Sequence, residues 1–200
     1  MTTRYTVLLL VLALVPMGCR SEQGSALYEA IDSEDLEAVE VLISQGANVN
    51  ERFWFQGSLA TPMQIALKKL SVANEANEAI ALAMIEAGGN PNIAWGVGST
   101  SEGEPGESMY ALSIVARSGR LGVVEALIEA GANVEGSEQG GKAMIAAAGA
   151  NRVEVLRVLL DAGADMSYKG DAGNTPLGAA VEAKAHEAIA FLEDRGASEW

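Results

Sequence analysis

The stretch that decides the fold is Gly173-Asn174-Thr175-Pro176-Leu177. A Thr side chain accepts a hydrogen bond from the first turn of a helix, and Pro at the first helical position sacrifices no helical hydrogen bond. Twenty-one residues after Thr175 stands the pair Gly196-Ala197, and Gly suits the left-handed residue that follows a helix. The stretch therefore predicts a unit with a helix start at one end and a helix stop at the other.

Weaker copies of this unit precede it. Each copy starts at a residue in the place of Thr175 and closes on a Gly: Ser25 to Gly46, Thr61 to Gly88, Tyr110 to Gly131 and Lys142 to Gly163. The interval is 21 residues in every copy except the second, where it is 27, an insertion of 6. The closing glycines are spaced 42, 43, 32 and 33 residues apart, which predicts an array of five repeats.

A period near 33 residues that carries Thr-Pro-Leu resembles the ankyrin repeat, and the resemblance covers roughly residues 25 to 198. It implies an all-α solenoid of about five helix-turn-helix repeats with β-turn fingers. Apolar residues spaced by three and four predict the same paired helices; in the fourth copy they are Met144, Ala146, Ala147, Val155, Leu156, Leu159 and Leu160. The family's His after Thr-Pro-Leu is replaced in every copy, by Tyr28, Gln64, Ser113, Ile145 and Gly178.

The first 18 residues have the pattern of a signal peptide. Arg4 precedes an apolar run over residues 7–15, which is shorter than the ~20 residues that span a bilayer. The run ends at Gly18-Cys19, which resembles a bacterial lipoprotein signal and implies a lipid on Cys19, although Pro16 stands where that pattern has an aliphatic residue. We expect a lipidated tether at 19–24, an ankyrin repeat domain at 25–200, and, from Arg20, routing to the outer membrane. Ordinary secretion is the alternative.

The charge balance limits the class of partner. The chain has 13 basic and 27 acidic side chains and a formal net charge of −14, which repels the phosphates of nucleic acids. We expect a protein partner with a basic patch, no nucleic acid, no membrane contact other than the lipid at Cys19, and a monomer. The alternative for most of these charges is a solvated acidic surface that keeps the protein soluble.

Residues with catalytic chemistry are scarce. The single Cys19 and single His186 leave no nucleophile–base pair, and we assign no catalytic residue, cofactor or metal ligand. The segment 136–143 approaches the phosphate-binding pattern G-x-x-x-x-G-K, but Ala143 stands where that site needs Ser or Thr for magnesium. We expect this segment to be the finger between repeats three and four, and the chain not to be an enzyme.

Aromatic and acidic residues gather in the predicted fingers. They are the partner-binding candidates Phe53, Trp54, Phe55, Trp95, Tyr168, Glu102, Glu104 and Glu107. Successive fingers of a solenoid emerge on one edge, and aromatic residues are common binding anchors. The alternative is that the triplet at 53–55 folds back and seals repeat two. A second candidate is the surface of the first, inner helices, around Arg117, Ser118, Gly149 and Ala150.

These expectations combine into one functional hypothesis. The chain is predicted to be a protein–protein interaction module anchored in the periplasm, which binds a partner through its fingers and inner helices as an adaptor or stabiliser. The alternative is an immunity-type inhibitor that neutralises a specific toxin or enzyme there. A hydrolase or a nucleotide-dependent enzyme is the minor alternative.

Overall fold

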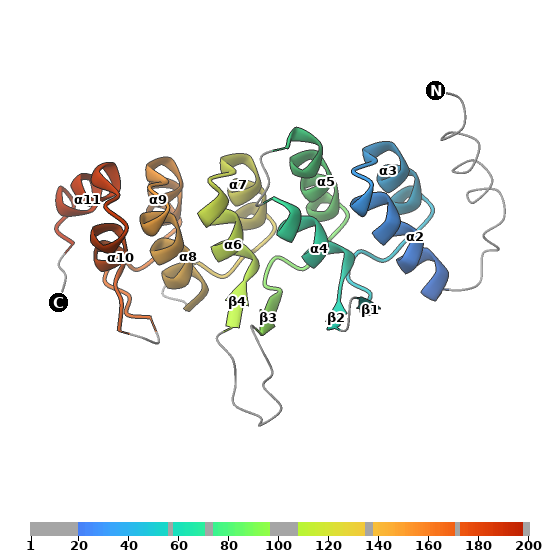
Figure 1. Ribbon diagram of the computed structural model, residues 1–200, viewed down its shortest axis with the longest axis horizontal. Helices are drawn as coiled ribbons and strands as arrows, with labels where there is room; N and C mark the ends of the chain where they lie inside the picture. The colour runs from blue at the N-terminus through green and yellow to red at the C-terminus, as the bar shows by residue number, and fades with distance from the viewer. Residues whose placement is uncertain are drawn as a thin grey trace.

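The computed structural model describes residues 20–55, 58–70, 74–96, 108–134, 138–170 and 173–197. Within them, helices pair antiparallel and the pairs stack side by side from the N-terminus to the C-terminus (Figure 1). The first helices of the pairs form one row, here called the first-helix row: α2 (Arg20–Asp32), α4 (Pro62–Lys69), α6 (Ala111–Ser118), α8 (Glu138–Gly149) and α10 (Pro176–Glu182). The second-helix row consists of α3 (Leu36–Ser44), α5 (Glu75–Glu86), α7 (Leu121–Glu129), α9 (Val153–Asp161) and α11 (His186–Glu193). The predicted all-α solenoid of five repeats is confirmed.

Two β-hairpins extend from one edge of the stack, below the first-helix row in Figure 1. Strand β1 (Phe53–Phe55) pairs antiparallel with β2 (Ser58–Ala60), and β3 (Ala94–Gly96) pairs antiparallel with β4 (Ser108–Tyr110). They are the fingers that lead into repeats two and three.

The predicted helix starts and stops have the expected geometry. All five closing glycines, Gly46, Gly88, Gly131, Gly163 and Gly196, have a left-handed φ between 83° and 90°. Thr61 caps α4 reciprocally with Gln64: the Gln64 amide donates to Thr61 Oγ1 at 3.2 Å, and the Thr61 amide donates to Gln64 Oε1 at 2.9 Å. Thr175 caps α10 by accepting a hydrogen bond from the Gly178 amide at 3.0 Å.

The core runs continuously along the space between the two rows. Each helix of the first-helix row contributes one residue at the same repeat position: Leu27, Met63, Leu112, Met144 and Leu177. Each helix of the second-helix row contributes Leu42, Met84, Leu127, Leu159 or Leu192. All ten side chains are at most 5% exposed, so every repeat supplies two large apolar groups to one shared core.

Asparagine side chains join neighbouring repeats at the base of the fingers. Asn50 Nδ2 donates to the Gly88 carbonyl at 2.8 Å, and the Asn90 amide donates back to Asn50 Oδ1 at 2.8 Å. Asn92 makes the same pair of bonds one repeat further on, to Gly131 and Asn133, at 3.0 and 2.8 Å. These bonds satisfy backbone groups at the ends of the second helices and fix the spacing of the repeats.

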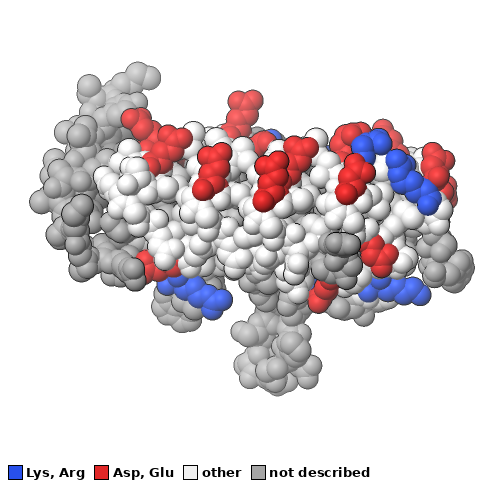
Figure 2. Space-filling view, turned by 180° about the vertical axis from the view of Figure 1, so that it is seen from behind, with Lys and Arg blue, Asp and Glu red and all other residues white. Residues whose placement is uncertain are grey.

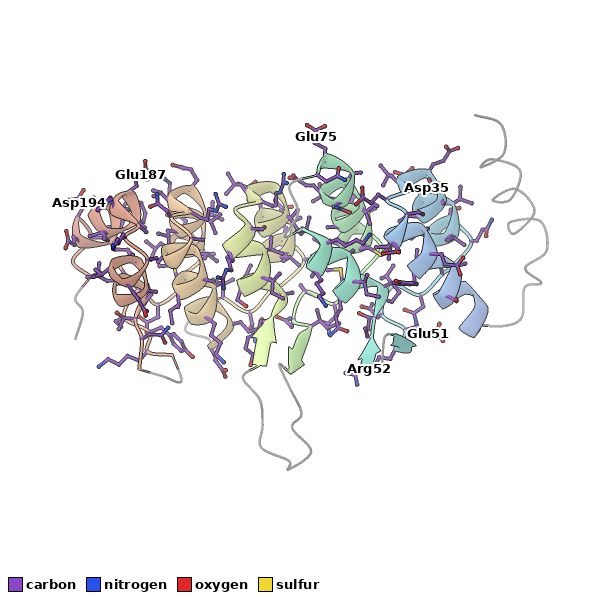
Figure 3. The ribbon with its side chains drawn as sticks, in the orientation of Figure 1. Asp35, Glu51, Arg52, Glu75, Glu187 and Asp194 are labelled. Atoms are coloured by element: carbon purple, nitrogen blue, oxygen red, sulfur yellow. The ribbon has the colours of Figure 1, made fainter. Side chains whose placement is uncertain are left out.

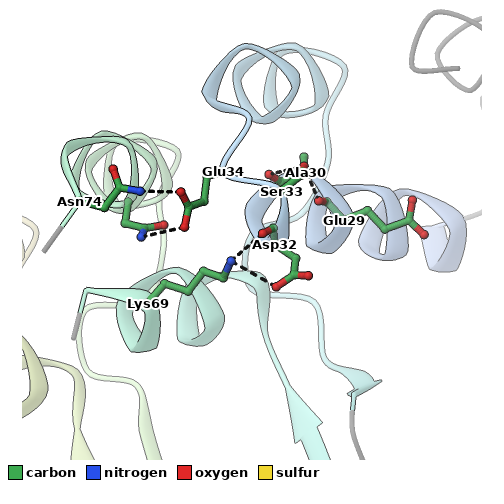
Figure 4. Close-up of polar contacts among 8 residues, drawn as sticks. Glu29, Ala30, Asp32, Ser33, Glu34, Lys69 and Asn74 are labelled. Atoms are coloured by element: carbon green, nitrogen blue, oxygen red, sulfur yellow. Dashed lines mark hydrogen bonds and ion pairs between the residues drawn. The ribbon is translucent and has the colours of Figure 1, made fainter. Parts of the chain in front are cut away.

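A second set of polar contacts joins repeats one and two at the turns between paired helices (Figure 4). Glu34, which has a left-handed φ of 59°, accepts hydrogen bonds from the side chains of Asn74 and Asn77. Lys69 Nζ donates to the Asp32 carbonyl at 2.7 Å and pairs with the Asp32 carboxylate at 3.2 Å. The two repeats are therefore tied on both sides of the shared core.

Helix α8 corrects one expectation from the sequence. Glu138 to Ala143, predicted to belong to a finger, forms the first turns of α8, and Glu138 pairs with Lys142 at 2.8 Å. The helix begins five residues before Ala143, which follows Lys142 as Pro176 follows Thr175, and the absence of side chains on Gly140 and Gly141 allows close packing in these extra turns. A Cβ on Gly140 would lie 2.2 Å from the Val134 carbonyl oxygen.

The structure differs from the sequence-based expectation at two further places. The proposed tether is not a separate segment from Arg20 onward, because residues 20–24 are the beginning of α2. Ala146, predicted to belong to the core, is only half-buried on the surface of α8.

We expect Leu159→Ala to lower the free energy of unfolding by ~2–5 kcal/mol, because it leaves a cavity in the shared core, where Leu159 is fully buried. Chemical denaturation of the two proteins measures the difference. Leu160→Ala is the matched control: its side chain is half-buried on the same helix, so the loss should be smaller. Equal losses would show that the assigned buried face of α9 is wrong.

We expect Gly141→Ala to lower the melting temperature, because the new Cβ would lie 2.1 Å from Cγ of Tyr168. Overpacking of this kind costs about 1–3 kcal/mol, against a gain of about 1 kcal/mol in helix propensity. In Gly149→Ala, at the end of the same helix, the Cβ makes an ordinary contact of 3.7 Å with the Ala179 carbonyl oxygen, so stability should be kept or raised. Thermal denaturation distinguishes the two, and a stable Gly141→Ala protein would contradict the packing of Tyr168.

Candidate protein-binding surface

The finger edge carries part of the aromatic set predicted from the sequence. Trp54 is the central residue of β1, opposite Leu59, and Trp95 is the central residue of β3, opposite Met109. The two hairpins lie on the same edge of the stack, as predicted, with Glu51 and Arg52 labelled beside the first (Figure 3). The side chains of Phe53, Trp54, Phe55 and Trp95 lie outside what the structure describes, as do all atoms of Cys19, Glu102, Glu104 and Glu107.

Tyr168 lies in the connection before repeat five, and its ring is half-buried. The ring lies over Gly141 of α8, where a Cβ would come within 2.1–2.5 Å of three ring carbons. Part of this aromatic surface is therefore already used in packing the connection before repeat five against repeat four. The sequence indicated an aromatic residue in a finger, but not that a glycine 27 positions earlier would receive it.

A groove lies on the first-helix row, where α6, α8 and α10 run side by side. Its volume is about 360 Å³. The floor is formed by the small residues Ala146 and Gly149 of α8 and Ala150, which follows the helix; all three are half-buried. Three of the four residues named from the sequence for this surface lie in or beside it: Arg117, Gly149 and Ala150 line the groove, whereas Ser118 turns its hydroxyl to the Val115 carbonyl at 2.7 Å.

The walls of the groove carry opposite charges. Arg117 stands on α6 and Glu182 on α10, on either side of the α8 floor, and both are exposed. Ala179 and Ala183 complete the α10 wall, and Ile145 adds an apolar side chain at one end. Within the described residues, neither Arg117 nor Glu182 forms an ion pair, so both charges face solvent.

Charge is divided unequally between the two helical rows. The second-helix row contains 11 acidic residues and one basic residue, Arg157, a net of −10. The first-helix row contains five acidic and five basic residues, a net of zero. Acidic side chains form a row along the full length of the stack in Figure 2, and Asp35, Glu75, Glu187 and Asp194 mark the edge of the second helices in Figure 3. The composition of the whole chain conceals this difference, which a count by helix would have revealed.

The ends of the helices make the acidity of the second-helix row more marked. Four of its helices close on an acidic residue: Glu86, Glu129, Asp161 and Glu193. A negative charge at a helix C-terminus interacts unfavourably with the helix dipole, so each of these residues lowers the stability of its helix by a few tenths of a kcal/mol or more. Arg117, by contrast, is in the last turn of α6, where the dipole favours a cation.

Negative charge surrounds Tyr28 at the N-terminal end of the first-helix row. Partial burial, followed by the carboxylates of Asp32 and Glu29, raises the pKa of the Tyr28 hydroxyl above its ordinary value. Tyr28 is therefore a neutral phenol at physiological pH, at the end of the row opposite to the groove.

The described part of the chain offers little for other chemistry. It contains no cluster of three or more His, Cys, Asp or Glu residues that could hold a metal ion. No helix in it is long and apolar enough to cross a membrane. His186 is exposed at the first position of α11, and Gly140 to Lys142, the glycine end of the near match to a phosphate-binding loop, lie inside α8 rather than in a loop before it.

Comparison with protein families matches nearly the whole repeat array. A single ankyrin repeat matches residues 24–53, and a model of three ankyrin repeats matches residues 68–170 and 112–199. No curated protein matches the chain. The matched segments together cover well over half of the sequence, so the chain belongs to the ankyrin repeat family.

Proposed function

We propose that this chain is an adaptor or stabiliser that holds a partner protein against its finger edge and its first-helix row. Ankyrin repeats form protein–protein interaction modules, whose stacking creates an extended surface for binding. The observation that carries the proposal is the groove of about 360 Å³ on the neutral first-helix row, at the C-terminal ends of α6, α8 and α10. The side chains that line the groove are partly or fully exposed, whereas the core side chains of the same helices are buried.

The two rows suit partners of different charge. The second-helix row, with a net charge of −10, would attract a basic surface through long-range steering. The first-helix row has no net charge, so a partner seated there is selected by shape and by individual charge pairs. A basic patch on the partner would therefore speed its approach without having to lie in the groove.

The second candidate is an inhibitor that neutralises a toxin or another enzyme. It is favoured by the concentration of 11 acidic residues on the second-helix row, because an acidic face complements a basic enzyme surface. An adaptor leaves the activity of its partner intact, whereas an inhibitor abolishes it. Once a partner is identified from an envelope extract, an assay of that partner with and without this protein separates the two.

The proposed location is the periplasmic side of the outer membrane, with a lipid on Cys19. Support comes from the apolar run that ends in Gly18-Cys19 and from Arg20 as the following residue. Helix α2 begins at Arg20, so an anchor on the neighbouring residue would hold the stack directly at the membrane surface.

We expect Trp54→Ala to weaken partner binding by about 2 kcal/mol or more and to leave the melting temperature nearly unchanged, as for an aromatic anchor. Tyr168→Ala is the contrasting variant: it should lower the melting temperature, because that ring packs over Gly141. Binding is measured with the partner recovered from envelope extracts, and stability by thermal denaturation. If Trp54→Ala lowers melting and keeps binding, the hairpin seals repeat two instead of anchoring a partner.

We expect Cys19→Ala to move the protein from the membrane pellet to the soluble fraction and to abolish fatty-acid labelling. The physical reason is that two or more acyl chains give stable anchoring, whereas the protein without them has no other membrane attachment in this proposal. Fractionation and labelling of the two proteins in parallel provide the measurement. A wild-type protein that is already soluble and unlabelled would establish ordinary secretion.

A further inference from the structure

The groove between α6 and α10 has a floor of small residues. Ala146, Gly149 and Ala150 present small groups to it, and all three are half-buried. A volume of about 360 Å³ is at the lower end of the range of ligand clefts, enough for an aliphatic or aromatic side chain with its neighbouring backbone. Its open side is bounded by the exposed residues Arg117 and Glu182, so an extended or helical segment of a protein can cross it.

The charges of the two walls give the groove a polarity. The α6 wall is positive: Arg117 is exposed there, and Arg152 Nε donates to the Arg117 carbonyl at 3.3 Å, which brings a second guanidinium close to this end of α6. The α10 wall carries Glu182, the last residue of its helix. A partner that is uniformly basic or uniformly acidic would meet a like charge at one of these walls.

We propose that the groove binds a segment of a partner protein in which an aliphatic residue is flanked by an acidic residue on one side and a basic residue on the other. The acidic residue lies over α6 at Arg117, the aliphatic side chain enters the groove above Gly149, and the basic residue lies over α10 at Glu182. This inference rests on the proposed function, because it specifies the partner chemistry of the same surface. It replaces a generally basic partner with one of mixed charge at this site.

Three synthetic peptides test the polarity. They share one length, capped ends and a central Leu, and they differ only in the flanking residues: one acidic and one basic, both basic, or both acidic. Dissociation constants for the fluorescently labelled peptides are measured by anisotropy with the wild-type protein and with the charge-reversal variants Arg117→Glu and Glu182→Lys.

The expected ranking changes with each variant. Wild-type protein binds the mixed peptide most tightly, Arg117→Glu prefers the doubly basic peptide, and Glu182→Lys prefers the doubly acidic peptide. Each reversal shifts the ratio of dissociation constants by about fivefold or more, since it replaces an attractive charge pair by a repulsive one. A peptide of mixed charge can enter in either chain direction, so single reversals discriminate better than a double reversal.

Two variants control for the overall charge. Arg52→Glu changes the net charge as Arg117→Glu does, but beside the first hairpin, and Glu125→Lys matches Glu182→Lys on the exposed face of α7. Both should keep the wild-type ranking. If a charge-reversal variant loses its cooperative melting transition, Arg117→Gln and Glu182→Gln take its place, and each should remove the preference for the mixed peptide.

Several outcomes of the peptide assay would overturn the inference. A polar groove is contradicted if the wild-type protein prefers the doubly basic peptide. It is also contradicted if the control variants change the ranking as much as the groove variants do, or if no peptide binds at about 1 mM. The proposed function fails by a different result, namely the recovery of no specific partner from envelope extracts. A partner that is recovered and is insensitive to Arg117→Glu and Glu182→Lys would overturn the groove inference alone.

Discussion

The structure depends on one constraint: a repeat buries its apolar face only against the next repeat. One position of the first-helix row shows this directly. Ile31, Leu67, Ala116 and Ala148 occupy it in the first four repeats and are fully buried, because the following repeat covers each of them. Val181 occupies it in the fifth repeat, which no further helix pair covers within the described residues, and is 43% exposed, the largest exposure of a bulky apolar side chain in that part of the chain. All five side chains are apolar, and the fifth differs in lacking a following helix pair within the described residues.

The same constraint explains how charge is distributed. Stacking buries one face of each helix in the core and another against the adjacent helix pair, so charged residues are confined to the faces that remain exposed. On the second-helix row these faces carry acidic residues, even at helix ends such as Glu129 and Asp161, where the helix dipole opposes a negative charge. The first-helix row keeps small residues at the surface of α8, which lets α6 and α10 approach it closely. The two rows therefore differ in kind: one presents acidic side chains to solvent, and the other presents small residues and no net charge.

Local patterns predicted most of this fold, because the positions that define a repeat are local in origin. The left-handed glycines and the Thr-Pro helix starts depend on residues within a few positions of each other, and they were correct at Gly46 and Gly196 alike. The packing of Tyr168 over Gly141 in the first turns of α8 was missed, because Tyr168 lies in the connection before repeat five and no window around Gly141 contains it. The groove was predicted only as a surface around Arg117, and its polarity required the placement of Glu182 on the opposite wall. The roles of Trp54 and Cys19 remain predictions.

The contact between Tyr168 and Gly141 has a consequence for how this array could have arisen and could change. Arrays commonly grow and shrink when whole units are duplicated or lost, which requires that any unit can follow any other. Here the ring lies in the connection before repeat five, and the glycine that receives it lies in repeat four. Insertion of a unit between them, or exchange of repeat four, would bring Tyr168 next to a residue other than Gly141. This junction therefore keeps its packing only when the exchanged unit has a glycine in the place of Gly141.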